Sequence, residues 1–85
     1  MTETAKLKFD KRGELIRFEV VSTGLTIEDL TAETYGIQRG ELRYDDISTD
    51  KAQVKRLVRF LNKKEPISDD KVWDWILYFI EEIDI

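Results

Sequence analysis

The sequence has no cysteine and no histidine among its 85 residues. Without cysteine the chain cannot form a disulfide or use a thiolate nucleophile, and without histidine it has no imidazole base and no switch that titrates near neutral pH. Zinc sites of the ordinary type are excluded too, because those two residue types supply most of their ligands. We therefore expect a protein that is not an enzyme, with no catalytic residues and no cofactor or metal.

Proline, glycine and long apolar runs are also scarce. One proline and four glycines are typical of one compact domain over residues 1–85, without linkers or low-complexity segments. No apolar run approaches the roughly 20 residues of a transmembrane helix, and the polar start Met1–Lys6 lacks the apolar core of a signal peptide. We expect a cytoplasmic protein that does not bind a membrane.

Charge of one sign is in excess, and it is unevenly distributed. The net charge is −4, which argues against general nucleic-acid binding. Residues 50–64 nevertheless carry six basic residues against one acidic residue, a net +5, whereas residues 65–85 carry one basic residue against seven acidic ones, a net −6. The chain thus has a basic segment followed directly by an acidic one.

Two segments alternate apolar and polar residues around a glycine, and each predicts a β-hairpin. The first covers about residues 6–21 and turns near Gly13, and the second covers about residues 33–47 and turns near Gly40. Glycine reaches the positive φ of such turns without a steric cost. Between the hairpins, Ser22–Ala32 has no clear period. It fits a capped helical turn or a short extended piece, and we predict an irregular link.

A glycine also falls inside the second hairpin, at Gly36. In that position glycine marks a β-bulge or a place where another part of the chain approaches closely.

Two helices are predicted to follow, over about residues 50–63 and 69–84. Asp50 is a good N-cap for the first, with Gln53 at the spacing of a capping box. Val54, Leu57, Val58 and Leu61 recur at helical spacing, and Pro66 disfavours helical geometry at the residue before it. The predicted fold is therefore α+β: a small, mainly antiparallel sheet from two hairpins, with two C-terminal helices packed on one face.

Three blocks of this part of the chain resemble a known protein family. They are Thr34-Tyr-Gly-Ile37, Asp46-Ile-Ser-Thr-Asp50, and the pattern Val54-x-x-Leu-Val-x-x-Leu-Asn62. In order and spacing they are similar to a family of small uncharacterised proteins of clostridial (Firmicute) bacteria, for which no function is known. The resemblance runs from about Glu33 to the C-terminus. It implies a bacterial cytoplasmic setting and no mechanism.

The last predicted helix is apolar over an unusually wide arc. At 100° per residue its apolar side chains cover roughly 200°, whereas a helix lying on one layer shows an arc nearer 100–140°. One interpretation is a helix sandwiched between the sheet and the other helix. The other is an exposed docking or dimer surface, since aromatic residues are enriched at such surfaces. The residues of the arc are Val72, Trp73, Trp75, Ile76, Leu77, Phe79, Ile80 and Ile83.

The basic segment offers a second candidate site. Its phosphate-binding candidates are Lys51, Lys55, Arg56, Arg59 and Lys63, which could neutralise phosphates of a nucleic acid. The alternative is an antiparallel helical hairpin that sets these residues beside the acidic ones of the last helix, where exposed ion pairs contribute only about 0–1 kcal/mol each.

Two further clusters have simpler explanations. The first is an acidic cluster that could suggest a site for Mg²⁺ or Ca²⁺, but its residues lack the spacing of a calcium loop: Glu41, Asp45, Asp46 and Asp50. The second is Tyr35 with Tyr44, which are more simply explained as cross-strand partners than as acid–base catalysts.

We therefore expect a protein-interaction module, acting as an adaptor or regulator or by self-association as a homodimer, whose contacts come from the last helix. The contact residues expected there are Trp73, Trp75, Leu77 and Tyr78. A regulatory nucleic-acid-binding protein is the alternative.

Overall fold

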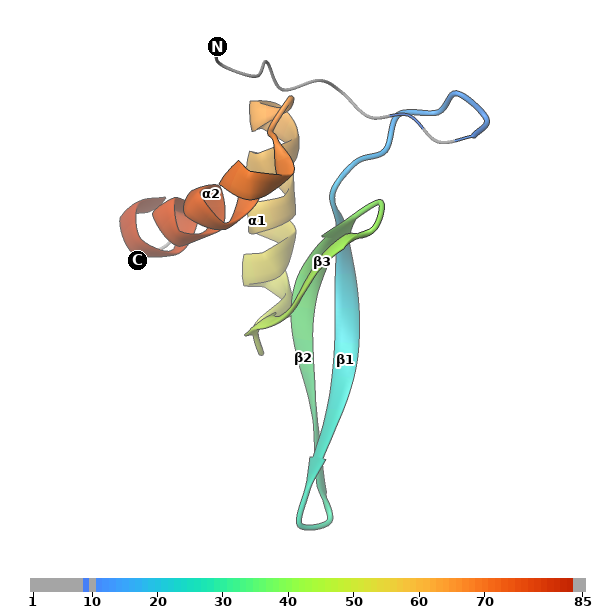
Figure 1. The fold of residues 1–85 in the computed structure, drawn as a ribbon. Coiled ribbons are helices and arrows are strands. Elements are labelled where there is room, and N and C mark those ends of the chain that lie inside the picture. The colour runs from blue at the N-terminus through green and yellow to red at the C-terminus, as the bar shows by residue number, and fades with distance from the viewer. Residues whose placement is uncertain (1–8, 10, 84–85) are drawn as a thin grey trace.

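The computed structural model describes residue 9 and residues 11–83, and they form an antiparallel sheet followed by two helices (Figure 1). The sheet has three strands in the order β1–β2–β3 among these residues. The α+β class and the two C-terminal helices predicted from the sequence are confirmed. The elements are β1 (Glu19–Ile27), β2 (Leu30–Arg39), β3 (Leu42–Ser48), α1 (Lys51–Lys64), the 3₁₀ turn η1 (Asp69–Lys71), α2 (Val72–Tyr78) and the π-helical turn η2 (Phe79–Ile83).

The structure contains only part of the first predicted hairpin, which was expected over about residues 6–21. Phe9 and Leu15 make an isolated antiparallel bridge around Gly13, whose φ of 81° is the left-handed conformation expected there. Residues 6–8 and 10 of the prediction lie outside the described residues. The residues from Glu19 onward pair with β2 instead, so the strand that follows Gly13 starts later than predicted.

The prediction of an irregular link at residues 22–32 is wrong. β1 and β2 run straight through this segment, paired from Glu19–Gln38 to Ile27–Leu30. The turn between them consists of Glu28 and Asp29, with φ of 48° and 68°. A two-residue turn with two positive φ values usually contains asparagine or glycine, and the absence of either concealed the hairpin.

The far end of this hairpin projects from the rest of the molecule as an arm, which we define as residues 24–33. Figure 1 shows it extending well beyond β3 and both helices. β3 pairs with β2 only from Tyr35 to Arg39, so among the described residues the arm contains only β1 and β2. Every side chain described in the arm is exposed.

Gly36 allows the backbone of β3 to lie unusually close to β2. The pairing of β2 with β3 shifts register between Tyr35 and Ile37, where Gly36 alone is opposite three residues of β3. Of the two alternatives that the sequence left open at Gly36, a bulge or a close approach, the geometry shows a close approach. A Cβ atom on Gly36 would lie 2.0 Å from the carbonyl oxygen of Tyr44. Glycine is therefore required here by the close approach of the β3 backbone. At the other end, Gly40 has φ of 60° in the predicted turn between β2 and β3.

The core lies between one face of the sheet and the two helices. Asp50 caps α1 as predicted, because its side chain accepts hydrogen bonds from the backbone of Ala52 and Gln53. Glu65 is extended, with ψ of 145°, so α1 ends before the proline. Side chains from the sheet, α1, α2 and the connecting loop form one buried apolar cluster: Phe18, Ile37, Val54, Leu57, Leu61, Ile67, Val72, Ile76 and Phe79.

A buried arginine joins the sheet to the loop between the helices. The side chain of Arg39 is 2% exposed, and it donates hydrogen bonds to the carboxylates of Glu65 and Asp69. Its guanidinium also lies 4.6 Å from the centre of the Phe18 ring. Nothing in the sequence pattern marked this contact, because the partners lie 26 and 30 residues away.

Candidate interaction surface on helix α2

α2 has a buried face and two partly open flanks. Val72, Ile76 and Phe79 point into the core and are at most 4% exposed. The first interpretation of the wide apolar arc is therefore correct for these residues, which pack between the sheet and α1. The remaining apolar side chains of α2 and η2 lie to either side, and their exposure distinguishes the two tryptophans.

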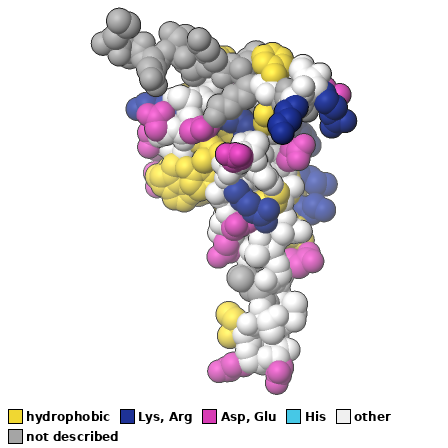
Figure 2. Space-filling view, turned by 45° about the vertical axis from the view of Figure 1, so that its right-hand side comes forward, with side chains coloured by type: hydrophobic (Ala, Val, Ile, Leu, Met, Phe, Trp, Pro, Cys, Tyr) yellow, Lys and Arg dark blue, Asp and Glu magenta, His cyan; other side chains and the backbone are white. Residues whose placement is uncertain are grey.

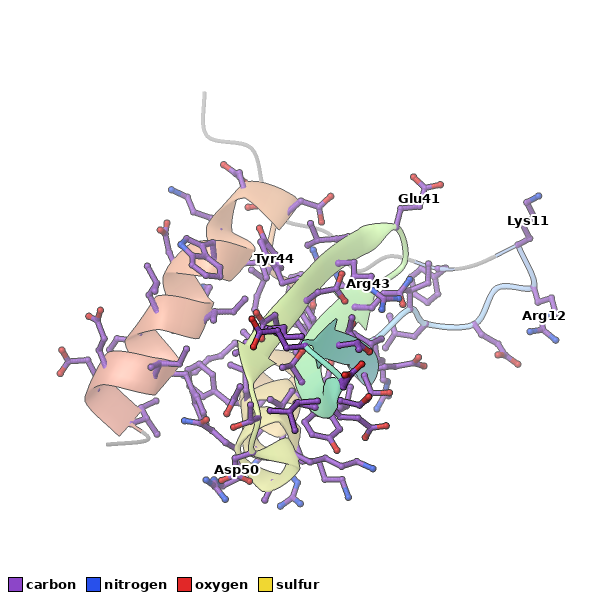
Figure 3. All side chains as sticks on the ribbon, turned by 90° about the horizontal axis from the view of Figure 1, so that it is seen from below. Lys11, Arg12, Glu41, Arg43, Tyr44 and Asp50 are labelled. Carbon is purple, nitrogen blue, oxygen red and sulfur yellow. The ribbon has the colours of Figure 1, made fainter. Side chains whose placement is uncertain are left out.

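Trp73 lies on the flank that faces β3. Its ring stacks on the ring of Tyr44 at a centroid distance of 5.4 Å, and Figure 3 shows Tyr44 extending from β3 toward the helix. Trp73 nevertheless remains 45% exposed, and Leu77, one turn later, is 36% exposed. Tyr44 thus holds the indole in place while much of the indole stays in contact with solvent.

Trp75 lies on the opposite flank, against α1. Its ring meets Phe60 edge-on at 5.8 Å and Tyr78 at 5.9 Å. The ammonium group of Lys64 lies 5.6 Å from the same indole, at cation–π distance. Trp75 is half-buried whereas Tyr78 is 48% exposed. Of the four predicted contact residues, Trp75 is mainly a packing residue, and the other three are accessible.

Trp73 and Leu77, with Tyr44 beside Trp73, form what we call the α2 surface. Tyr78 is also exposed, but it lies on the opposite flank, where its ring stacks on Phe60. The same helical segment carries exposed carboxylates at Asp70, Asp74, Glu81 and Glu82. None of these four forms an ion pair with a residue that the structure describes. Figure 2 shows a broad apolar area on the body of the molecule with acidic side chains next to it.

Four basic residues of α1 form no ion pair with α2 among the described residues. Figures 1 and 3 show the helices crossing at a large angle, not lying side by side. Lys51, Lys55, Arg59 and Lys63 are exposed and form no ion pair within the described part of the chain. The alternative that paired these charges in a helical hairpin is therefore wrong for these four residues. Lys51 does lie near the Tyr35 ring, at 5.9 Å.

The acidic residues considered as a cation site are spread along β3. Glu41 lies in the turn before this strand and Asp50 follows its end, and Figure 3 shows them far apart. Asp45 pairs instead with Arg43, whose Nε donates to it over 2.7 Å. Within residues 11–83 no group of three or more acidic side chains is arranged to hold a metal ion.

Hydrogen bonds shift the pKa of two groups near the sheet. The bond from Arg43 lowers the pKa of the Asp45 carboxyl below its ordinary value, and a bond from Thr23 acts in the same direction. The hydroxyl of Tyr35 donates to Glu33, which raises the pKa of that tyrosine. Asp45 is exposed and Tyr35 is half-buried, and neither lines any of the hollows described for this structure.

A hollow in the described structure lies away from the α2 surface. It has a volume of about 460 Å³, and its lining mixes charged and apolar side chains: Arg12, Glu14, Leu15, Ile16, Arg17, Glu19, Gln38 and Gly40. Figure 3 shows Arg12 on a loop on the far side of the sheet from α2. Its lining carries arginine and glutamate in equal number, so it has no preference for a ligand of either charge.

Comparisons with known proteins add no assignment to this geometry. No helix among the described residues is long and apolar enough to cross a membrane. Neither the models of protein families, nor the curated proteins, nor the solved structures include a match to this chain.

Proposed function

We propose that this protein is a non-enzymatic interaction module that binds a partner protein through the α2 surface. The observation that carries the proposal is the state of Trp73, which is held against Tyr44 and is still 45% exposed. An indole that is already ordered loses little conformational entropy when a partner covers it. Leu77, one turn after Trp73, extends the same apolar area. The resemblance to clostridial proteins supports a bacterial cytoplasmic setting for this activity.

The charge around the surface defines the chemistry of the partner. Asp70, Asp74, Glu81 and Glu82 are exposed and unpaired within the described residues, and Lys71 is the one basic residue of η1, α2 and η2. A second copy placed on this surface would bring carboxylates against carboxylates, which is unfavourable. A cationic amphipathic helix matches the α2 surface, because its apolar side chains can cover the indole of Trp73 and its lysine or arginine side chains can pair with the surrounding carboxylates. We propose such a helix as the partner segment.

The test uses a cationic amphipathic peptide of leucine and lysine as the probe, with a leucine–glutamate peptide of the same pattern as its control. Tryptophan fluorescence reports binding, because covering Trp73 shifts its emission to shorter wavelength. The exposed part of the indole is roughly 110 Å² for a side chain of this size, which at ~25 cal/mol per Å² corresponds to about 2–3 kcal/mol. Trp73→Ala should therefore weaken binding at least tenfold, measured by calorimetry.

Two matched controls separate the surface from general effects. Leu30→Ala removes an apolar side chain that is 77% exposed on the arm, and it should leave the affinity unchanged. Asp74→Lys should weaken binding, whereas Glu41→Lys, the same change of charge on the turn before β3, should have a much smaller effect. Equal binding of the anionic peptide, or an undiminished affinity of a folded Trp73→Ala variant, would contradict the proposal.

A second candidate function is nucleic-acid binding by α1. The observation that favours it is the row of exposed, unpaired basic residues Lys51, Lys55, Arg59 and Lys63, which recur every four residues and so rise about 6 Å at each step. If α1 binds phosphates, Lys55→Glu with Arg59→Glu should abolish binding of a labelled DNA or RNA duplex, and the logarithm of the affinity should fall steeply with the logarithm of salt concentration. Unchanged anisotropy of the label at low salt would exclude this function.

A further inference from the structure

The two helices expose charges of opposite sign. The basic face of α1 consists of Lys51, Lys55, Arg59 and Lys63, and the acidic face of α2, with η1 and η2, consists of Asp70, Asp74, Glu81 and Glu82. All of these side chains are exposed, and none of them forms an ion pair among the residues that the structure describes. Their charges are therefore available to a second molecule.

Both faces point away from the core. At about 100° per residue of an α-helix, Arg59 lies roughly 200° around α1 from the buried Leu57, and Asp74 lies roughly 200° around α2 from the buried Val72. Figure 3 shows carboxylate side chains along the outer side of α2, and the two helices cross at a large angle (Figure 1). A contact between the basic face and the acidic face therefore requires two copies of the chain.

The two faces also match in spacing. The basic residues recur every four residues, and four residues of an α-helix rise about 6 Å. Asp70, Asp74 and Glu82 follow the same interval of four, with the exposed Tyr78 at the position between Asp74 and Glu82. An aromatic ring is itself a favourable neighbour for lysine or arginine. Each row thus offers an oppositely charged or aromatic side chain at the steps of the other.

We propose that copies of this chain associate head to tail, with the basic face of α1 of one copy on the acidic face of α2 of the next. Two acidic faces or two basic faces would repel, so the contact joins unlike faces. Such a contact is heterologous. A pair of copies keeps one unused basic face and one unused acidic face, to which further copies can add.

The inference rests on the acidic rim that the proposed function also uses, but it does not rest on Trp73. At about 100° from Asp74 around the helix, Trp73 is turned toward β3, where it stacks on Tyr44. Exposed ion pairs are individually weak, so the association needs several of them together. We therefore expect it at high protein concentration and low salt.

The first measurement is the mass of the nuclease-treated natural protein by light scattering, at about 1 mM protein. In 20 mM salt the average mass should rise with concentration above the 10.1 kDa of one chain. In 300 mM salt it should fall back toward that value, because the Debye length decreases from about 20 Å to about 6 Å.

Charge reversal then tests which faces meet. The α1 variant is Lys55→Glu with Arg59→Glu, and the α2 variant is Asp74→Lys with Glu82→Lys. Each alone should lose at least about tenfold in self-association, because it sets like charges against each other. Mixed in equal amounts they should form a one-to-one complex, since the first keeps its acidic face and the second keeps its basic face. All four changes in one chain should restore self-association.

Matched controls separate the faces from net charge. Each reversal changes the charge by two, so the α1 variant moves from −4 to −8 and the α2 variant moves from −4 to 0. Lys11→Glu with Arg17→Glu gives the first net charge, and Glu19→Lys with Glu28→Lys gives the second, all at exposed positions outside the two faces. Both controls should keep most of the self-association.

Three results would overturn the proposal: a natural protein that stays monomeric at about 1 mM in 20 mM salt, variants whose mixture does not associate, or a rise in mass that occurs only when nucleic acid is added. Trp73→Ala distinguishes this inference from the proposed function. It should weaken binding of the cationic peptide and leave self-association within about twofold. Loss of either result without the other identifies which of the two proposals fails.

Discussion

Replacing Arg39 by methionine should destabilise the protein by about 3 kcal/mol. Methionine fills a similar volume, so the main effect is the loss of charge. The Glu65 side chain is 11% exposed, and it would remain as a nearly buried carboxylate without its cation, a change that typically costs about 3–5 kcal/mol. We take the lower end, because the Nε atom of Arg39 is itself buried without a partner and that unfavourable group disappears with the substitution.

The assay is urea unfolding followed by circular dichroism, with two companion variants. Asp69→Asn should cost less than about 1 kcal/mol, because the Asp69 side chain is 49% exposed and water can solvate the charges that remain. Glu65→Gln keeps an oxygen for the backbone N–H of Ile67 and should fall between the two. At roughly 1 kcal/mol per M urea, Arg39→Met should lower the unfolding midpoint by about 3 M.

The double variant decides whether the cause is an unpaired charge. If the cost of Arg39→Met comes from leaving Glu65 uncompensated, Arg39→Met with Glu65→Gln should be less destabilised than the sum of the single changes by at least about 1 kcal/mol. An additive result would mean that packing around the arginine stem, against Phe18, supplies the stability. A neutral Arg39→Met would refute the reasoning altogether.

Three further predictions concern the sheet. Gly36→Ala should cost about 2–3 kcal/mol in urea unfolding, because its Cβ would clash with the backbone oxygen of Tyr44; an unchanged midpoint would contradict the close approach. Glu28→Asn with Asp29→Gly should stabilise the protein by about 1 kcal/mol, since both residues now hold positive φ at a steric cost; a loss of stability in thermal unfolding would show that the turn is of another type. The folded-state pKa of Asp45 is lowered, so its contribution to stability is present above the unfolded-state pKa and is lost as pH falls through the folded-state value. Asp45→Asn should therefore flatten the acid side of the stability curve, and an identical slope between pH 5 and pH 2 in both proteins would count against this assignment.

The helices were predictable because their signals are local. Asp50 caps α1 through backbone groups two and three residues away, and the apolar residues of α1 repeat at the period of a helix. The turns at Gly13 and Gly40 were predictable for the same reason, since positive φ at a glycine depends on the residue itself. The absence of cysteine and histidine likewise excludes disulfides, thiolate nucleophiles and imidazole bases, whatever fold the chain adopts.

The β1–β2 hairpin could not be identified in this way. Its turn uses Glu28 and Asp29, a pair without the glycine or asparagine that usually marks a turn with two positive φ values. Its arm has no third strand and no helix over it in the described structure, so burial imposes no alternation on its sequence. Pairing over the full length of β1 and β2 had to be seen in the structure.

By itself, the sequence determined the class of fold, the cap of α1, the turns at Gly13 and Gly40, and the width of the apolar arc on the last helix, because each depends on residues close together in the chain. Only the tertiary structure decided that Trp73 is open and Trp75 is packed, because that follows from which side of α2 meets α1 and which meets β3. It also decided that Lys51, Lys55, Arg59 and Lys63 of α1 form no ion pair among the described residues, since the two helices cross (Figure 1). The angle between two helices depends on how their side chains interdigitate, and no local pattern contains that information.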